Sequence, residues 1–304
     1  MKAIQKVLFP TDFSRESRKA FAYAVDLARR YGAELHLFHA VVLHEGRTHV
    51  LDERFPDLSG LRDTLEAMAV QDIEELILDH DVPETVITEV LREADSAGPA
   101  IVRYAETHDI DLIVIATHGR RGVRRFLLGS VAAEVVRLST CSVLAVRRTG
   151  EEEAVHPVSR ILAPVDFSES GNEALEAACG LASRWGSELR LLHVLEDFIH
   201  PAFYNMGATS ITDLQPDIIE RTEAVMDDLV GNTVPCDGVS IDRSAVEGHP
   251  GREIVRYIQD HHVDLVVMAT HGRRGIRDFL LGSTTENVIA GADCPVLVVK
   301  RRRA

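Results

Sequence analysis

The sequence is short of aromatic residues and of positive charge. Aromatic residues make up only 5% of the 304 residues, so aliphatic side chains and alanine have to fill the core. Lysine and arginine number 33 against 48 aspartates and glutamates, which gives a formal net charge of −15. A chain this acidic does not attract nucleic acid or anionic membranes through its overall charge. We therefore expect neither as a partner.

The sequence also lacks long hydrophobic runs and paired cysteines. No stretch approaches the roughly 18 apolar residues of a transmembrane helix, and the opening MKAIQKVLFPTDFS has too short an apolar run for a signal peptide. None of the four cysteines (Cys141, Cys179, Cys236 and Cys294) belongs to a C-x-x-C pair. We expect four reduced thiols and a cytoplasmic protein.

The signatures of several enzyme classes are missing as well. The chain has no G-x-x-x-x-G-K-[ST] motif, so it is not a P-loop NTPase. His36 and His39 stand three apart on a predicted strand, where their side chains point to opposite faces and cannot share a metal. Ser130 and Ser283 could attack a phosphoryl group only with a partner base and a bound metal. We predict no catalytic residues and no dedicated metal site.

An internal repeat organises the chain. LFPTDFSRES at 8–17 recurs as LAPVDFSES at 162–170, and THGRRGVRRFLLGS at 117–130 recurs as THGRRGIRDFLLGS at 270–283. Between 111–148 and 264–301, 22 of 38 positions are identical. Each copy is long enough for its own core. The repeat predicts a domain at 1–148, a polar linker at 149–159 and a second domain at 160–304.

Within each copy, apolar segments of strand length alternate with segments of helical periodicity. ELHLFHAVV and DLIVIA are typical of buried strands, while the residues from Ser14 to Gly32 have the spacing, start and stop signals of a helix. Such alternation favours a parallel sheet covered on both faces. We predict an α/β fold with two doubly wound, Rossmann-like domains, each a five-stranded parallel sheet flanked by helices.

The repeated loop has the composition of a phosphate cradle. It begins where a buried strand ends and finishes where a helix starts, which is where doubly wound sheets bind ligands. Gly119 and Gly129 allow close approach of the main chain, and Ser130 stands at a helix start, where free N–H groups favour an anion. The alternative is that the glycines only make a turn and the arginines form a solvated face. Repetition with the spacing intact favours the cradle.

These motifs resemble the universal stress protein family, in its ATP-binding, tandem two-domain form. That branch carries Gly-x-x-Gly, nine residues, then Gly-(Ser/Thr). Here the pattern reads Ala116-x-x-Gly119, nine residues, Gly129-Ser130, and again Ala269-x-x-Gly272, nine residues, Gly282-Ser283. The family's Pro-x-Asp turn is present twice. The departure is alanine at the first glycine, which would cost about 1–2 kcal/mol if that position needs a positive φ.

The resemblance implies a nucleotide site in each half. Asp12 and Asp166 should lie near adenine and ribose, and the loop amides and serines should hold ribose and phosphates. His118 and His271 either contact the ligand or cap their strands. The predicted binding residues are Pro10, Thr11, Asp12, Ala40, Val41, Ala116, His118, Gly119, Arg120, Gly129, Ser130 and Val131 in the first half, and Pro164, Val165, Asp166, Val194, Ala269, His271, Gly272, Arg273, Gly282, Ser283 and Thr284 in the second.

The resemblance also implies ATP as ligand, with Mg²⁺ or Mn²⁺ accompanying it, at most slow ATP hydrolysis, and a stress-response role through ligand-dependent interactions with an unidentified protein partner. The last strands, Val143–Val146 and Val296–Val299, would pair as an internal pseudo-dimer, and two chains could form a homodimer. An interaction scaffold with degenerate sites or another small ligand is the alternative. HPAFYNMGATSITDL at 200–214 motivates it, although packing over the domain's own core also accounts for that segment.

Overall fold

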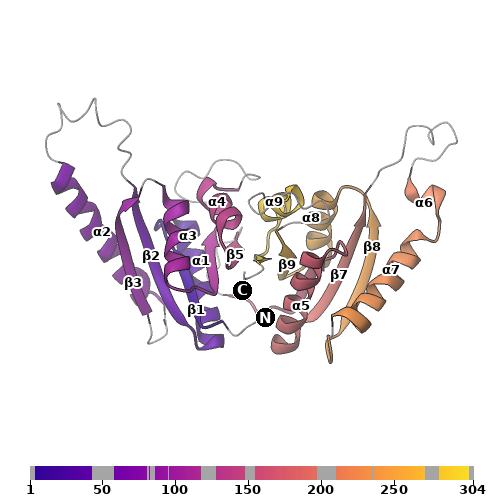
Figure 1. Ribbon diagram of the computed structural model, residues 1–304. Helices are drawn as coiled ribbons and strands as arrows, with labels where there is room; N and C mark the ends of the chain where they lie inside the picture. The colour runs from indigo at the N-terminus through magenta and orange to yellow at the C-terminus, as the bar shows by residue number, and fades with distance from the viewer. Residues whose placement is uncertain are drawn as a thin grey trace. The chain divides into compact units, whose positions relative to one another are not determined.

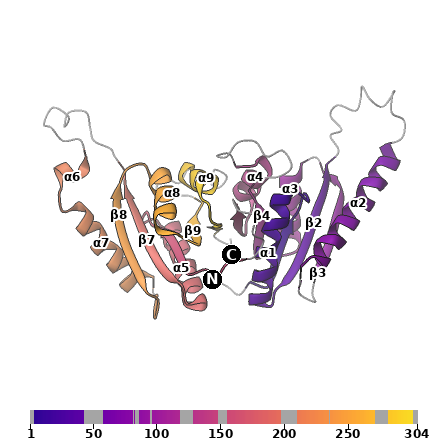
Figure 2. The ribbon, with the colours of Figure 1, turned by 180° about the vertical axis from the view of Figure 1, so that it is seen from behind.

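The computed structural model describes residues 4–42, 58–80, 82, 86–94, 96–117, 128–147, 155–196, 210–234, 236–270 and 281–300. The chain divides into two compact units with a break between Val155 and His156. Each unit carries one copy of the repeat, so each is described by itself. Figures 1 and 2 show strands covered by helices in both units.

The N-terminal unit alternates strands and helices as the sequence predicts. In chain order its elements are β1 (Lys6–Pro10), α1 (Arg15–Tyr31), β2 (Glu34–Val42), α2 (Leu58–Leu78), β3 (Val86–Ala94), α3 (Ala97–Thr107), β4 (Leu112–Ala116), α4 (Ser130–Leu138) and β5 (Ser142–Val146).

The C-terminal unit repeats this order and adds short helical pieces. Its elements are β6 (Arg160–Pro164), α5 (Glu169–Trp185), β7 (Glu188–Leu195), α6 (Ile211–Leu214), α7 (Ile218–Asp228), a π-helical turn (Leu229–Thr233), β8 (Ile241–Glu247), α8 (Pro250–His261), β9 (Leu265–Ala269), α9 (Ser283–Gly291) and β10 (Val296–Val299).

Both sheets are parallel and have the same strand order. The N-terminal order is β3-β2-β1-β4-β5, and the C-terminal order is β8-β7-β6-β9-β10. The order reverses at the β1–β4 pair and at the β6–β9 pair. Because parallel crossovers are right-handed, connections that run in opposite directions from this point place their helices on opposite faces. The predicted fold of two Rossmann-like halves is confirmed.

Local signals set the ends of the first helix in each unit. Ser14 caps α1 by accepting a hydrogen bond from the Ser17 amide, and Gly32 ends it at φ 60°. Ser168 and Gly186 do the same for α5, with Gly186 at φ 68°. A serine at the first position satisfies an otherwise unpaired amide, and a glycine at the last adopts the left-handed conformation without strain.

An aspartate before the fourth strand of each unit ties the sheet together. Asp111 Oδ2 accepts hydrogen bonds from the amides of Gln5 and Lys6 at 2.9 and 3.0 Å. Asp264 Oδ2 accepts the amides of Ser159 and Arg160, both at 2.8 Å. The first and fourth strands therefore start in register, and their carboxyl ends reach the same edge of the sheet.

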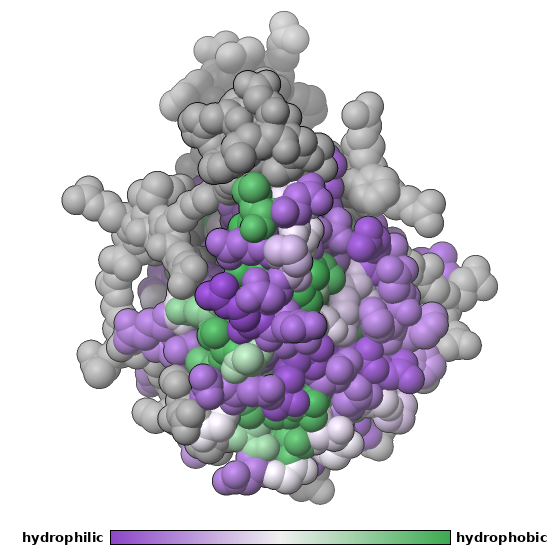
Figure 3. Space-filling view, turned by 90° about the vertical axis from the view of Figure 1, so that its right-hand side faces the viewer, coloured by the Kyte–Doolittle hydropathy of each residue, from purple (hydrophilic) through white to green (hydrophobic). Residues whose placement is uncertain are grey.

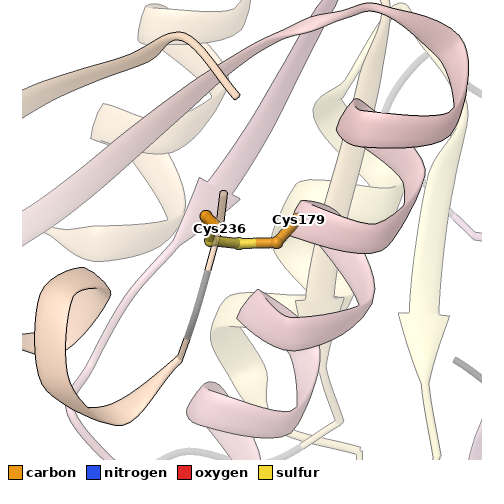
Figure 4. The surroundings of a disulfide bond; sticks show 2 residues. All are labelled: Cys179 and Cys236. Atoms are coloured by element: carbon orange, nitrogen blue, oxygen red, sulfur yellow. A yellow bond between two sulfur atoms is a disulfide. The ribbon is translucent and has the colours of Figure 1, made fainter. Parts of the chain in front are cut away.

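The cysteines differ from the prediction of four reduced thiols. Cys179 on α5 and Cys236, in the segment before β8, form a disulfide with their Cα atoms 5.2 Å apart (Figure 4). The prediction was wrong for this pair because 57 residues separate the two cysteines and no spacing motif marks them. Cys141 and Cys294 are free and buried, and burial raises the pKa of the Cys294 thiol.

The surface of the C-terminal unit carries both hydrophilic and hydrophobic residues. Figure 3, which views the molecule from the side that carries α6 and α7 in Figure 1, shows mostly hydrophilic residues with hydrophobic ones in separate small groups. Val225 and Leu214 are the large exposed hydrophobic residues of these two helices. Among the described residues, every helix is too short or too polar to cross a lipid bilayer.

Candidate functional site

The predicted site residues gather at the edge of each sheet where the strand order reverses. In the N-terminal unit, Pro10 ends β1, Ala116 ends β4, and Gly129 and Ser130 begin α4. In the C-terminal unit, Pro164, Ala269 and the pair Gly282–Ser283 hold the corresponding places. In a doubly wound sheet this edge is the ligand-binding crevice.

The turn after the first strand has an unusual backbone in both units. Phe13 has φ 59° and Phe167 has φ 58°, in the left-handed region that a bulky residue rarely adopts. Asp12 Oδ1 accepts a hydrogen bond from the Ser14 amide at 3.0 Å, and Asp166 Oδ1 accepts one from the Ser168 amide at 3.1 Å. Backbone strain of this kind concentrates at functional sites. Its repetition marks the turn as a built feature of both units.

A histidine that the sequence reasoning missed holds each of these turns. His39 Nδ1 lies 2.7 Å from the main-chain oxygen of Thr11, and His193 Nδ1 lies 2.7 Å from that of Val165. A carbonyl oxygen can only accept, so Nδ1 carries the proton in both rings. Each imidazole also contacts the strained phenylalanine, with ring centroids 4.7 Å apart for Phe13–His39 and 4.8 Å for the second pair. The sequence could have indicated these residues, because His39 and His193 occupy matching positions of the repeat.

The end of the fourth strand meets the start of the following helix. The Gly129 amide donates to the main-chain oxygen of Thr117 at 2.8 Å, and the Gly282 amide donates to that of Thr270 at 3.0 Å. Gly129 and Gly282 occupy the N-cap positions, and neither helix receives a hydrogen bond from a cap side chain. The first amides of α4 and α9 are therefore suited to an anion. Ser130 and Ser283, the first residues of these helices, are exposed there, followed by Val131 and Thr284.

The two alanines at the first glycine position carry no backbone strain. Ala116 and Ala269 are the last residues of regular strands, and neither has a positive φ. The cost that the sequence suggested for their Cβ atoms does not arise. The adjoining residues His118, Gly119, Arg120, His271, Gly272 and Arg273 lie outside the described residues.

The second strand contributes main chain to this edge. Val41 and Val194 are 7% and 8% exposed, so their side chains belong to the core and only their main-chain groups can face a ligand. The β2–β3 ladder is irregular here: Ala40 pairs with Leu91 and Val42 with Ala94, which places two residues opposite Val41. The β7–β8 ladder is regular through Val194. A bulge next to a site re-aims main-chain groups.

A second polar cluster lies away from this edge. His36 is buried, with Nδ1 2.9 Å from the Tyr104 hydroxyl and Nε2 3.5 Å from Glu34 Oε2. Burial lowers the pKa of His36 below 6.5, against the opposing effect of Glu34, and the neighbouring His108 and Lys6 lower it further. The His108 ring stacks on Tyr104 with centroids 3.9 Å apart.

The C-terminal unit has a permanent cation at the same position. Arg190 Nη2 lies 2.9 Å from Glu188 Oε1, and Nη1 donates to His261 Nδ1 at 2.9 Å. His261 stacks on Tyr257 with centroids 3.9 Å apart, as His108 stacks on Tyr104. The cluster therefore has the same stacked tyrosine and histidine in both units, but its central residue is a titratable histidine, His36, in the first and a permanently charged arginine, Arg190, in the second. In the described part of the chain, no group of three or more His, Cys, Asp or Glu side chains is arranged to hold a metal.

Two doubly wound domains with the same strained turn define a duplicated α/β protein with a Rossmann-like fold in each half. The model of the Universal stress protein family matches residues 3–147 and again residues 157–300. The chain belongs to the universal stress protein family, as a tandem member with two such domains.

Parts of the chain are similar to other universal stress proteins, of which some match over nearly their whole length and some over part of it. Universal stress protein MJ0577 of Methanocaldococcus jannaschii is 31% identical over 157 residues, which cover 48% of this chain and 96% of the relative. Universal stress protein Rv2005c of Mycobacterium tuberculosis is 27% identical over 198 residues, covering 64% of this chain and 63% of the relative.

Solved structures resemble the whole chain. The crystal structure of a universal stress protein from Archaeoglobus fulgidus has a TM-score of 0.62 at 24% identity, and the match covers 97% of this chain and 96% of that one. At this identity, the likeness supports the fold alone.

Proposed function

We propose that this universal stress protein binds ATP at the carboxyl edge of one or both sheets and acts through ligand-dependent interactions rather than turnover. The observation that carries the proposal is the pairing, in each unit, of a strained Asp-Phe-Ser turn with a glycine-capped helix start across the strand reversal. A carboxylate can accept from ribose hydroxyls, while helix amides donate to phosphate oxygens.

The residues present fit a nucleotide better than a resident metal. Asp12 and Asp166 each supply one carboxylate at the turn, and no metal-binding group accompanies them among the described residues. Mg²⁺ prefers to keep several waters and to bind through phosphates with one or two carboxylates. Any Mg²⁺ or Mn²⁺ would therefore arrive with the nucleotide, which would supply most of its ligands.

The proposed absence of turnover rests on the same chemistry. Ser130 and Ser283 are exposed at their helix starts. The described residues place the carboxylates in turns, where Asp12 and Asp166 accept main-chain amides. A serine in that setting stabilises an anion through its hydroxyl and the helix amides and does not become a nucleophile.

Titration calorimetry of the full chain with ATP and Mg²⁺ tests the proposal. We expect saturable binding by the wild type, a reduced number of sites in Gly129→Val, in Gly282→Val or in each of them, and loss of binding in the double variant, because a side chain at the helix cap blocks the approach of phosphate. Gly180→Ala, in mid-helix of α5 with open space around it, is the matched control. The proposal fails if the wild type does not bind, or if both valine substitutions leave the titration unchanged.

The same samples can be used to test whether two chains form a homodimer and whether the protein is instead an interaction scaffold with another ligand or none. Light scattering coupled to gel filtration measures whether two chains associate, which stays a prediction from the sequence. Native mass spectrometry of freshly purified protein identifies what remains bound. A copurifying apolar molecule, together with no response to ATP, would favour the interaction scaffold.

A further inference from the structure

A strained residue in each candidate site has to be held in place by its surroundings. Phe13 and Phe167 have φ of 59° and 58°. A left-handed conformation of a bulky residue persists only where the neighbouring structure fixes it. The aspartate that the proposed function assigns to the ligand comes directly before each of them, as Asp12 and Asp166. Whatever fixes the turn therefore also fixes this carboxylate.

In the N-terminal unit, β2 holds both main-chain groups of the residue before the aspartate. The Thr11 amide donates to the Phe38 oxygen at 2.9 Å, which continues the β1–β2 hydrogen bonding past the end of β1. The Thr11 oxygen accepts from His39 Nδ1 at 2.7 Å. On the other side of the aspartate, Asp12 Oδ1 accepts the Ser14 amide. Asp12 thus lies between two fixed points, one of which is made by the side chain of His39.

The C-terminal unit has the same set of bonds. The Val165 amide donates to the Leu192 oxygen at 2.9 Å, and the Val165 oxygen accepts from His193 Nδ1 at 2.7 Å. Asp166 Oδ1 accepts the Ser168 amide. In both units, a donor on the side chain of the second strand therefore sets the orientation of the peptide that leads into the aspartate.

Each imidazole also contacts the residue after the aspartate. The ring centroids of Phe13 and His39 are 4.7 Å apart, and those of the corresponding C-terminal pair are 4.8 Å apart. Other support differs between the units, since Val165 stands where the first unit has the hydroxyl of Thr11. Among the described side chains, the histidine and the aspartate are the support that both turns have in common.

We propose that His39 and His193 are positioning residues of the nucleotide sites, each holding the peptide that places the aspartate. This inference rests on the proposed function. A carboxylate has about four acceptor sites, so Asp12 or Asp166 can accept a ribose hydroxyl besides the main-chain amide. Neither histidine needs to contact the ligand, because it acts through the turn. Its effect should therefore fall on the nucleoside part of ATP and not on the phosphates.

Replacing both histidines at once tests this whether one site or both bind ATP. Leucine and asparagine branch in the same way, but only asparagine can donate from the position of Nδ1. In calorimetry on the full chain, His39→Leu/His193→Leu should weaken ATP binding roughly tenfold or more, the equivalent of one hydrogen bond to a charged group. His39→Asn/His193→Asn should keep most of the wild-type affinity. The control is His108→Leu/His261→Leu, which removes the matching histidines of the polar cluster away from this edge and should bind ATP as the wild type does.

A second ligand and a second background separate positioning from general damage. Inorganic triphosphate lacks the ribose, so in the leucine variant its affinity should fall much less than that of ATP, whereas a loss of structure would weaken both. In an Asp12→Ala/Asp166→Ala background, no carboxylate remains to be positioned. Adding the two leucines at 39 and 193 should then weaken ATP binding little further, because residues that act through one another are not additive.

Several results would overturn the inference while ATP binding stands. These are a leucine variant that binds ATP as tightly as the wild type, an asparagine variant as weak as the leucine variant, equal losses for ATP and triphosphate, an undiminished further loss in the alanine background, or the same loss in the control. Absence of any ATP binding by the wild type would instead remove the proposed function.

Discussion

Breaking the Cys179–Cys236 disulfide should destabilise the C-terminal unit alone. The bond joins α5 to the segment that leads into β8, and the only cysteine of residues 1–155 is Cys141, which is free. Cys179 is 4% exposed, so the residue is buried in the unit. The N-terminal unit has Val25 at the matching position of its first helix. It therefore serves as an internal control.

The size of the effect follows from the loop that the bond closes. The cysteines are 57 residues apart, and the chain-entropy model gives about 4 kcal/mol for closing such a loop in the unfolded state. For a domain of this size, each kcal/mol shifts the melting temperature by roughly 2–4 °C. Reduction should therefore lower the melting temperature of the C-terminal unit by on the order of 10 °C.

Hydrogen exchange read by mass spectrometry separates the two units in one experiment. We compare the oxidised wild type, the wild type with reductant, and the Cys179→Ser/Cys236→Ser variant. Peptides from α7 and β8 should lose protection in the second and third samples. Peptides from β1 and β4 should not change, and scanning calorimetry of the same samples gives the shift in melting temperature.

Two results would refute this reasoning. One is a count of four free thiols in protein purified and unfolded without reductant, which would mean that the bond does not form. The other is an oxidised wild type whose C-terminal peptides exchange as fast as those of the double serine variant. Cys294→Ser is the control for replacing a buried thiol that forms no bond: it keeps the disulfide, so without reductant its α7 and β8 peptides should stay protected.

Two further predictions concern single residues. Because burial lowers the pKa of His36, the folded N-terminal unit binds a proton at His36 less well than the unfolded chain does. Its stability should therefore be full above pH 6.5 and fall as the pH drops toward the lowered pKa, by at most about 1.4 kcal/mol per pH unit. The free energy of unfolding in urea should differ less between pH 7.5 and 5.5 for His36→Gln than for the wild type, and an unchanged difference would refute the assignment. Gly186→Ala, at the end of α5, should lower the stability of the fold by about 1 kcal/mol because residue 186 has φ 68°. Gly180→Ala, within α5, should instead raise the stability by roughly 0.5–1 kcal/mol. Thermal melts of both variants should show melting temperatures that move in opposite directions.

The fold could be predicted because its signals are local and occur twice. Ser14 and Gly32 mark the ends of α1, and Ser168 and Gly186 mark those of α5. The continuous apolar strand at Leu112–Ala116 indicates burial on both faces. Each of these features depends on a few neighbouring residues, so the sequence displays it directly.

The details of the site could not be predicted, because they depend on contacts across the fold. A left-handed conformation at Phe13 has no sequence signature, since asparagine, aspartate and glycine are the usual residues there. The His39–Thr11 bond joins residues 28 apart in the sequence, and the disulfide joins residues 57 apart. Positions that matched in the repeat gave a reason to examine His39, but no reason to expect which atom it would bond.

Because the domain is duplicated, features that both units share can be separated from features that differ between them within one chain. The backbone of the turn is the same in both units, with φ of 59° and 58°, and a matching aspartate and histidine hold it in each. The hydroxyls of Thr11 and Ser17 support it in the N-terminal unit, where the C-terminal unit has Val165 and Gly171. The buried cluster likewise keeps its stacked tyrosine and histidine while His36 is replaced by Arg190. The same backbone geometry is thus found in both units although some of the side chains around it differ. A repeated motif therefore locates a site in each half, but whether the two sites are equivalent depends on the residues packed behind it.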